Sequence, residues 1–535
     1  MEMALLIVAL VILVCIFANR ISGRFGVPML LVFIGVGMLF GSDGIAKIPF
    51  EDYDLAQTGC TAALIFIMFY GGFGTNWHKA KPVAVKSLLL SSFGVVLTAL
   101  ITGVFCHFAL GIDMAKGMLI GACLGSTDAA SVFSILRSRQ LNLKYNTASL
   151  LELESGSNDP FAYMLTMIIL SVIKGGASPA DLALMLIKQL IIGAGLGFLI
   201  GIGAWLIMKK FKFGSGGMES VLMVAVALLS YAAPAVLGGN GFLSAYIVGI
   251  YLGNKPIEGK RSLVHFFDGV TGLLQMLVFF MLGLLAFPSK LPQVVLPGIV
   301  IALFMSFVAR PIAVFGILAP FKCKLNQMVL VSWAGLRGVA SIVFAIMAAA
   351  AFEFQEYDLF HTVFITVLFS LLLQGSLIPL LAKKLDMIDE TNNVMTTFND
   401  YSEELPVQFI RISVSEGDRW AGKQIKEISL PPETLVAMIL RGSERIVPKG
   451  FTRLAPGDTA VLCAPALSDR AGISLTEINV TKKSVYCGLK LCELPPDNGS
   501  LVVLIKRGSR VIIPRGSTAF REGDILVVNS AEKVL

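Results

Sequence analysis

The segment LELESGSNDPFAYM, residues 151–164, carries acidic and amide side chains in the middle of a long apolar stretch. That stretch is long enough for a helix that crosses a lipid bilayer, which takes about 20 residues. Ionisable groups inside such a helix are costly and indicate a functional site. On the helix, Asn158 shares a face with Glu154, whereas Asp159 points about 100° away. Pro160 lacks a backbone donor and therefore frees a carbonyl oxygen close to Asp159.

The composition of the whole chain indicates a membrane protein. Of its 535 residues, 56% are hydrophobic and only 15% are charged, and the mean hydropathy is +0.79. Soluble proteins average about 25% charged residues, so a cytosolic enzyme, a disordered scaffold and a nucleic-acid binder are excluded, despite the net charge of +7. Charge density about doubles after residue 390, which predicts a membrane domain followed by a soluble one. The eight cysteines include no C-x-x-C pair, and we expect no disulfide framework or structural metal site.

The apolar pattern predicts about thirteen membrane-spanning helices. They cover residues 3–18, 25–41, 55–74, 83–110, 115–137, 147–174, 182–208, 219–236, 239–254, 265–287, 293–319, 326–352 and 359–384. Basic residues concentrate in alternate loops, which the positive-inside rule assigns to the cytoplasm. Examples are Arg20, Lys79, Arg137, Lys209, Lys255, Lys322 and Lys383. We therefore expect a multi-pass protein of the plasma (inner) membrane, with its N-terminus outside and its C-terminal tail in the cytoplasm.

Five ionisable side chains lie near the middle of the membrane in this scheme. They are Asp128, Glu154, Asp159, Arg310 and Arg337. With a rise of about 1.5 Å per helical residue, their depths permit two neutralising pairs, Glu154 with Arg310 and Asp159 with Arg337. Three acids against two bases leave one carboxylate for an exchangeable cation or proton. Because burial disfavours a charged carboxylate, a proton and a cation compete for it.

Two spans are interrupted at their centres by glycine and polar residues. Residues 117–133 read GMLIGACLGSTDAASVF, and residues 333–345 read WAGLRGVASIVFA. Broken helices of this kind expose carbonyl groups and helix ends that coordinate a small cation. The two spans are seven spans apart and so run in opposite directions, which predicts an inverted repeat of spans 4–6 in spans 11–13.

The polar groups of these spans combine into an oxygen-rich site that suits a hard cation. The candidate ligands are the Asp159 carboxylate, the Asn158 amide, the hydroxyls of Ser155, Ser157 or Thr127, and the carbonyl freed by Pro160. Competition between a cation and a proton at one site with alternating access is an antiport mechanism.

Four motifs in order on the expected spans resemble the monovalent cation:proton antiporter-1 superfamily, of the bacterial sodium/proton or potassium/proton kind. They are Ser126-Thr127-Asp128, Glu154-Ser155-x-x-Asn158-Asp159, Ala309-Arg310-Pro311 and Gly335-Leu336-Arg337-Gly338, and the resemblance covers residues 1–385. It implies that Asp159 exchanges ion and proton and that Asn158 marks an electroneutral exchanger. It further assigns Thr127, Asp128 and Ser155 to the lining of the ion site, and Glu154, Arg310 and Arg337 to charge compensation.

Simpler roles stay open for three of these residues. Asp128 can cap the helix that follows the break. Arg310 and Arg337 can hold the fold without contacting the ion.

The tail contains an internal repeat with an offset of 66 residues. After a membrane domain of residues 1–384 and a polar linker of residues 385–404, LVAMILRGSERIVPKGFTRLAPGDTAVLC (435–463) aligns with LVVLIKRGSRVIIPRGSTAFREGDILVVN (501–529). Each copy reads as a strand, a short helix, a hairpin with an R-G-S turn and a G-D turn into a last strand. We predict two small α+β modules, residues 405–470 and 471–535.

These modules resemble the C-terminal subdomain of potassium-conductance regulators, the TrkA-C type. Modules of that type dimerise and bind small ligands or nucleotides, and cyclic di-AMP is one known ligand. The resemblance therefore implies a homodimer, a regulatory effector at the tail and a preference for potassium. A purely structural dimerisation tail is the alternative, and no motif identifies ligand residues. The sequence indicates no resident cofactor and no nucleic-acid partner.

Together these features predict an electroneutral antiporter that exchanges K+, or else Na+, for H+ under the control of its tail. A potassium channel gated by the same modules would need a carbonyl filter such as TVGYG, and the nearest string, FYGGFGTNW at residues 69–77, does not match. A transport-inactive sensor is the other alternative, and an intact Asp159 speaks against it. The sequence shows no nucleophile–base pair, so we do not expect an enzyme.

Overall fold

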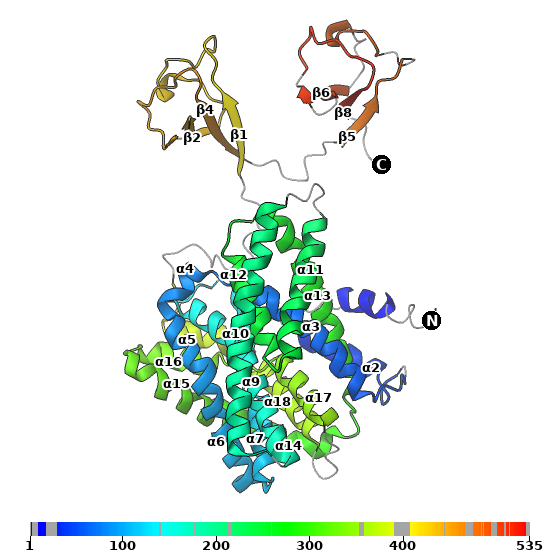
Figure 1. The fold of residues 1–535 in the computed structure, drawn as a ribbon, viewed down its shortest axis with the longest axis vertical. Helices are drawn as coiled ribbons and strands as arrows, with labels where there is room; N and C mark the ends of the chain where they lie inside the picture. The colour runs from blue at the N-terminus through cyan, green and yellow to red at the C-terminus, as the bar shows by residue number, and fades with distance from the viewer. Residues whose placement is uncertain are drawn as a thin grey trace. The chain divides into compact units, whose positions relative to one another are not determined.

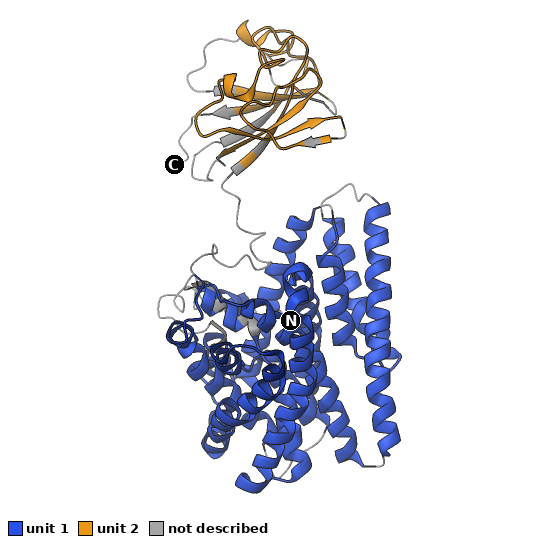
Figure 2. Ribbon diagram, turned by 90° about the vertical axis from the view of Figure 1, so that its left-hand side faces the viewer, with its two compact units in different colours: residues 1–403 blue, residues 404–535 orange. Residues whose placement is uncertain are grey.

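The computed structural model divides the chain into two compact units, Met1–Glu403 and Glu404–Leu535 (Figure 2). The structure describes residues 2, 9–17, 29–45, 47–138, 141–175, 177–211, 217–257, 259–351, 358–389, 407–442, 444–465, 474–482, 484, 486–493, 500–507, 510–512 and 514–530. Each unit has hydrophobic core residues of its own.

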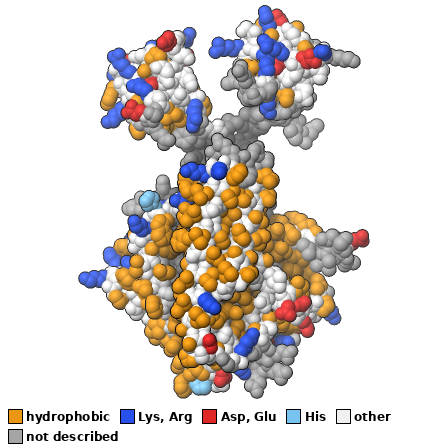
Figure 3. All heavy atoms as spheres, in the orientation of Figure 1, with side chains coloured by type: hydrophobic (Ala, Val, Ile, Leu, Met, Phe, Trp, Pro, Cys, Tyr) orange, Lys and Arg blue, Asp and Glu red, His pale blue; other side chains and the backbone are white. Residues whose placement is uncertain are grey.

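The first unit is a bundle of helices (Figure 1). In chain order they are α2 (Met29–Phe40), α3 (Tyr53–Gly74), α4 (Trp77–Ala80), α5 (Ala84–Leu89), α6 (Val95–Leu110), α7 (Met114–Cys123), α8 (Ala129–Ser138), α9 (Thr147–Lys174), α10 (Pro179–Lys210), α11 (Met218–Val236), α12 (Gly241–Gly253), α13 (Lys260–Leu285), α14 (Leu291–Phe304), α15 (Arg310–Leu318), α16 (Leu325–Trp333), α17 (Val339–Ala351) and α18 (Leu359–Lys384). Apolar side chains cover most of the visible surface of this unit (Figure 3), as expected where lipid surrounds it.

Seven helical segments of the described residues are long and apolar enough to cross a membrane, and four shorter apolar helices accompany them. The predicted helical membrane protein is thereby confirmed. The number of thirteen spans stays a prediction, because residues 3–8 and 18 of the first span and residues 25–28 of the second lie outside the described residues.

Polar side chains start several of these helices. Ser178 and Asp181 form a capping box at the start of α10, in which each side chain accepts a backbone N–H bond from the other residue. Asp52 caps α3 and Asn240 caps α12 more simply, because one side-chain oxygen of each accepts a single backbone N–H bond. These caps satisfy amide groups that would otherwise be unpaired at the helix ends.

The same three features follow one another twice along the chain. The first is a long helix with a π-helical turn, at Leu90–Gly94 between α5 and α6 and at Met305–Ala309 between α14 and α15. The second is a broken helix, α7 with α8 and α16 with α17, and the third is a long helix, α9 or α18. Both predicted broken helices are confirmed, and the repeated order supports the predicted repeat. The π-helical turns were not predicted.

Helices α3 and α10–α13 enclose a second, smaller core that includes Phe69, Phe73, Met223 and Phe267. Within this group α12 packs closely on α3 and α10, and it also contacts α9. The long helix α10 runs along the face of the unit that is turned to the viewer in Figure 1. Through α12, this group of helices packs against one side of α9.

The second unit contains two antiparallel four-stranded sheets, in the orders β1-β4-β2-β3 and β5-β8-β6-β7. The strands are β1 (Val407–Ser413), β2 (Leu435–Arg441), β3 (Glu444–Ile446), β4 (Thr459–Pro465), β5 (Ser474–Asn479), β6 (Ser500–Arg507), β7 (Arg510–Ile512) and β8 (Asp524–Ser530). The predicted repeat is confirmed, and the predicted short helix of each copy is a single 3-10 turn, Ile425–Glu427 or Leu491–Glu493.

An arginine and a buried aspartate make the same contacts in both sheets. Nε and Nη2 of Arg441 donate to the two carboxylate oxygens of Asp458 at 2.8 Å, and Arg507 donates in the same way to Asp524 at 2.7 Å. These bonds hold the pKa values of Asp458 and Asp524 below the usual range of a carboxyl group. The contacts explain why the R-G and G-D landmarks recur in the sequence.

Candidate functional site

The breaks in the two interrupted helices hydrogen-bond to each other. The Asp128 amide donates to the Leu336 carbonyl at 2.7 Å, and Nη1 of Arg337 donates to the Ser126 carbonyl at 3.2 Å. The breaks approach this closely because Gly338 has no side chain: a β-carbon there would lie 2.4 Å from the β-carbon of Asp128. Each break thus satisfies backbone groups that the other leaves unpaired.

Helix α9 passes beside the first break and presents Asp159 to it. The Ser126 hydroxyl donates a hydrogen bond to Oδ1 of Asp159. Only 6% of the Asp159 surface is exposed, and no basic group of the described residues forms an ion pair with it. A buried carboxylate is therefore held by a hydroxyl and not by a counter-charge.

Asn158 and Ser155 fix the backbone and the side chain of Thr127. The Thr127 amide donates to Oδ1 of Asn158 at 3.3 Å, and Nδ2 of Asn158 donates to Oγ1 of Thr127 at 2.6 Å. The Ser155 hydroxyl donates to the Thr127 carbonyl at 2.6 Å. The structure thus brings Thr127, Ser155, Asn158 and Asp159 together around the first break.

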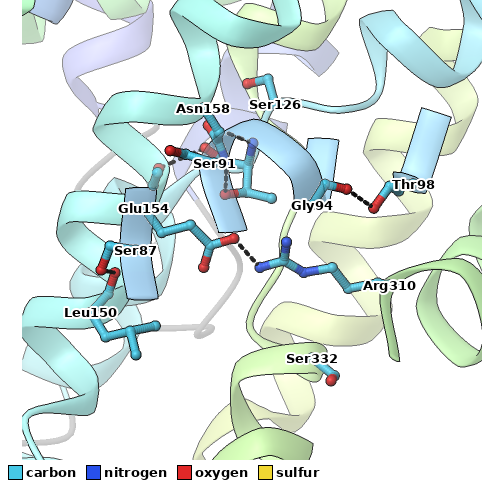
Figure 4. A network of polar contacts seen from close by, with 12 residues as sticks. Ser87, Ser91, Gly94, Thr98, Ser126, Leu150, Glu154, Asn158, Arg310 and Ser332 are labelled. Atoms are coloured by element: carbon cyan, nitrogen blue, oxygen red, sulfur yellow. Dashed lines mark hydrogen bonds and ion pairs between the residues drawn. The ribbon is translucent and has the colours of Figure 1, made fainter. Parts of the chain in front are cut away.

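Glu154, which lies five residues before Asp159 on α9, forms a buried ion pair with Arg310 of α15. Nη2 of Arg310 lies 2.5 Å from Oε1 of Glu154, and the two side chains are 4% and 1% exposed. Figure 4 shows the two side chains pointing toward one another. This predicted pair is present, and Gly335 makes room for it, because a β-carbon there would lie 2.8 Å from Nε of Arg310.

The second predicted pair, Asp159 with Arg337, is wrong. Arg337 donates to the Ser126 carbonyl, while the hydroxyl of the same serine donates to Asp159. Arg337 is therefore linked to Asp159 by hydrogen bonds through Ser126. Arg337 also lines a cavity of about 10 Å³, roughly the space of one water molecule. Other residues of this cavity are Ser306, Arg310, Thr366, Ser370 and Gln374.

Asp128 caps α8, which is the simpler of its two predicted roles. Its Oδ1 accepts the Ser131 amide at 3.2 Å and its Oδ2 accepts the Ser131 hydroxyl at 2.5 Å. The start of a helix also stabilises a negative charge. Its predicted part in the lining of the ion site rests on its position next to Thr127.

Two contacts that the sequence did not predict extend the site. One is the bond from the Ser126 hydroxyl to Asp159. The other comes from Asn240, whose Nδ2 donates to the Pro160 carbonyl at 2.9 Å while its Oδ1 caps α12. The string G-G-N-G at residues 238–241 is a signal for a helix start, but it does not indicate a contact with α9.

The site can hold a small ion that comes and goes. One carboxylate, several hydroxyl oxygens and the ends of two half-helices meet in a buried place, and hard cations prefer such oxygen ligands. The described residues contain no group of three or more His, Cys, Asp or Glu that could hold a metal ion permanently.

Comparison with known proteins places these features in a family. Residues 7–384 match the transmembrane sodium/hydrogen exchanger family, and residues 409–466 and 475–531 match the TrkA-C domain. The K(+)/H(+) antiporter NhaP2 of Shewanella sp. (strain ANA-3) is 36% identical over 466 residues, which cover 86% of this chain and 80% of that relative. The K(+)/H(+) antiporter NhaP of Alkalimonas amylolytica is 33% identical over 448 residues, covering 83% and 78%.

A solved structure agrees with this match. The sodium proton antiporter MjNhaP1 from Methanocaldococcus jannaschii has a TM-score of 0.63 and 25% sequence identity, and covers 72% of this chain and 99% of that one. The match to the exchanger family includes both broken helices and every site residue named above. The chain therefore belongs to the sodium/hydrogen exchanger family and carries two TrkA-C domains in its second unit.

Proposed function

We propose that this cation:proton antiporter exchanges one K+ for one H+ at Asp159. The observation that carries the proposal is the position of Asp159, which is buried beside the first break without an ion pair to Arg337. K+ is favoured over Na+ because the relatives that cover 86% and 83% of the chain are both named K(+)/H(+) antiporters. The match to the sodium proton antiporter of known structure covers less of the chain, 72%.

The carboxyl group of Asp159 holds a proton or a cation, but not both. When it is charged, the Ser126 hydroxyl stabilises the carboxylate, and the oxygens of Thr127 and Ser155, which are held at the same break, supply further ligands. When the cation leaves, burial of the carboxylate favours uptake of a proton. Each occupied form is thus neutral, which lets the site cross the membrane interior at low cost.

Asn158 sets the stoichiometry in this scheme. Its amide is uncharged and is engaged with Thr127, so it positions the break without titrating. One titratable carboxyl group then serves one cation, and the exchange is electroneutral. Glu154 with Arg310, and Arg337 through Ser126, compensate the remaining buried charges.

The second unit gives the exchange its regulation. We infer from the likeness to TrkA-C domains that the tail dimerises in the cytoplasm and binds a small effector, such as the nucleotide cyclic di-AMP. The basic loops support a plasma-membrane protein with its N-terminus outside.

Proton flux in inside-out membrane vesicles tests the proposal. A preset pH gradient is collapsed by adding K+, Na+ or Li+ to vesicles that contain the parent chain, Asp159→Asn or Asp386→Asn. Asp386 is a suitable control because its side chain is 89% exposed. We expect the parent and Asp386→Asn to move protons with K+ most effectively, and Asp159→Asn to move none. Flux that persists in Asp159→Asn would show that the site is misassigned.

The same vesicles distinguish the alternatives. A channel would pass K+ without moving protons, and its flux would follow the membrane potential, whereas electroneutral exchange would not. A transport-inactive sensor would move no ion with or without cyclic di-AMP.

A further inference from the structure

The chain leaves α18 through a short segment, residues 385–389, that pairs with the loop between α8 and α9. Leu143 of this loop and Ile388 of the segment form an antiparallel β-bridge. Two backbone hydrogen bonds of 2.9 Å flank the bridge, from the Lys144 amide to the Met387 carbonyl and from the Asp389 amide to the Asn142 carbonyl. The side chains of Leu143 and Met387 are buried, with 4% and 0% of their surface exposed. We call residues 142–144 and 387–389 together the clamp.

The clamp adjoins the starts of both helices that lead to the site. Thr147, the first residue of α9, accepts at its hydroxyl a hydrogen bond from Nε2 of Gln327 in α16 at 3.1 Å. The neighbouring Asn326 of α16 donates through Nδ2 to the Leu385 carbonyl at 2.8 Å. Helix α9 carries Asp159, and α16 leads into the second break. The end of α18 is therefore bonded to α16 and, through the clamp, to the loop that enters α9.

Two residues between the clamp and α9 have backbone conformations that are disfavoured for residues with a side chain. Tyr145 and Asn146 have φ angles of 61° and 54°, in the left-handed region. Such conformations persist where the surroundings impose them. Here Gln327 donates to the Tyr145 carbonyl at 3.3 Å, and Nζ of Lys324 donates to the Tyr145 hydroxyl at 2.8 Å. A loop held in this way transmits a movement of the clamp to the start of α9.

The clamp also lies on the route from the helical unit to the tail. The second unit begins at Glu404, and Asp389 is the last residue that the structure describes before residue 407. Because the chain is continuous, a pull from the tail reaches residues 387–389 before it reaches α18. A simple anchor for the end of α18 would also account for the bridge, so the two roles have to be separated by experiment.

We propose that the clamp couples the tail to the exchange site. A change in the tail moves residues 387–389, the β-bridge carries the movement to residues 142–144, and the loop carries it to α9 and Asp159. The inference rests on the proposed exchange at Asp159 and on the proposed binding of an effector by the tail. It assigns to the clamp the regulation of the exchange and no part in the exchange itself.

Asp389→Pro tests this role, because proline lacks the amide that donates to the Asn142 carbonyl. Ile388 is extended in the bridge, as the residue before a proline prefers. Asp389→Ala is the matched control, since it removes the same carboxylate and keeps the amide. The full chain is reconstituted into proteoliposomes, and K+-driven proton flux is measured with and without cyclic di-AMP as the probe. Binding of the nucleotide is measured in parallel by calorimetry.

We expect cyclic di-AMP to change the flux of the parent and of Asp389→Ala by the same factor. In Asp389→Pro the change should be about fivefold smaller, the effect typical of one lost backbone hydrogen bond. The flux without nucleotide and the affinity for the nucleotide should stay close to those of the parent, which a damaged fold or a damaged tail would not allow.

A disulfide across the bridge supplies a rescue. Residues 143 and 388 form a pair without hydrogen bonds between them, and the side chains of such a pair lie close enough for a disulfide. In an Asp389→Pro chain that also carries Leu143→Cys and Ile388→Cys, oxidation should restore the response to the nucleotide, and reduction should remove it again. With only one of the two cysteine substitutions, oxidation should restore nothing.

The outcomes separate this inference from the proposed function. If Asp389→Pro responds like the parent, or if the disulfide restores nothing, the clamp is not the route and the exchange site stands. If the parent does not bind cyclic di-AMP or does not respond to it, the proposed regulation fails and this inference fails with it. If Asp159→Asn, measured in the same series, keeps its flux, the proposed exchange itself fails.

Discussion

Glu154 and Arg310 neutralise each other in the interior of the helical unit, so neither can be removed alone without leaving a buried charge. We expect Glu154→Gln to lower the free energy of unfolding by about 3–5 kcal/mol, measured by denaturant or thermal unfolding of the purified full chain. A double variant with Arg310→Met should recover part of this loss.

The exposed pair of Lys144 with Asp386 provides the control for that measurement. Its side chains are 31% and 89% exposed, and such surface pairs contribute less than about 1 kcal/mol. Asp386→Asn should therefore leave unfolding almost unchanged. A Glu154→Gln protein as stable as Asp386→Asn would contradict the importance of the buried pair.

Single residues show which part of the site could be predicted from the sequence. Residue counts along the spans give depth, and depth permitted the pair of Glu154 with Arg310 that the structure contains. Depth does not give the direction in which a side chain points, and for this reason the pairing of Asp159 with Arg337 was wrong. The Ser126 bridge could not be predicted, because it depends on how two breaks cross in space.

At the scale of the helix, the crossing of the breaks requires glycine. A β-carbon at position 338 would meet Asp128 at 2.4 Å, whereas one at position 316 of α15 would meet nothing within 4 Å. We expect Gly338→Ala to abolish most cation-driven proton flux, because the breaks must move apart. Gly316→Ala should keep the flux of the parent, since alanine favours a helix. Equal fluxes in the two variants would show that the close crossing is not required.

Breaks and π-helical turns differ in how well a sequence reveals them. Glycines and polar residues within an apolar span mark a break, and both breaks were predicted. A π-helical turn such as Leu90–Gly94 only shifts the hydrogen-bond pattern by one residue. It needs no special composition, so the apolar pattern gave no sign of it.

In the sheets of the second unit, the paired aspartates make stability depend on pH. The pKa values of Asp458 and Asp524 are lower in the folded chain than in the unfolded one. Their stabilisation is therefore complete above the unfolded pKa of about 4 and is lost as the pH falls through the folded pKa. Hydrogen exchange of the full chain, corrected for intrinsic rates, should show constant protection of β4 and β8 from pH 7 to about 5 and a decrease below about 4.

Asp458→Asn should reduce the protection of β4 at pH 7 and leave that of β8 unchanged, because the two sheets have separate cores. Glu416→Gln, at an exposed position of the same module, serves as the control. Equal protection of β4 in both variants would contradict a stabilising role for the Arg441–Asp458 contact.

On the scale of the whole molecule, the proposed exchange site belongs entirely to the first unit. Its residues lie between Ser126 and Gly338, and the first unit has its own core. The structural match takes in 99% of MjNhaP1 but only 72% of this chain. A chain that ends at Glu403 should therefore keep cation-driven proton flux in vesicles, and Asp159→Asn should abolish it. A truncated chain that is folded but inactive would show that the tail is needed for exchange itself.

The large-scale organisation was accessible from the sequence because it depends on composition. Apolar spans, a change in charge density and an internal repeat are visible without coordinates, and they predicted the helical unit and the two sheets. The packing of α12 on α9 depends on tertiary contacts such as Tyr246 over Gly156, which no local pattern encodes.

The two breaks are 210 residues apart and align as Gly125 with Gly335, Thr127 with Arg337 and Asp128 with Gly338. Together with the matching π-helical turns, this alignment indicates a duplicated ancestral half. The copies differ in charge, because the first break carries Asp128 and the second carries Arg337. A variant with an acid in both breaks, or an arginine in both, would upset the balance of buried charges that the proposed electroneutral exchange requires.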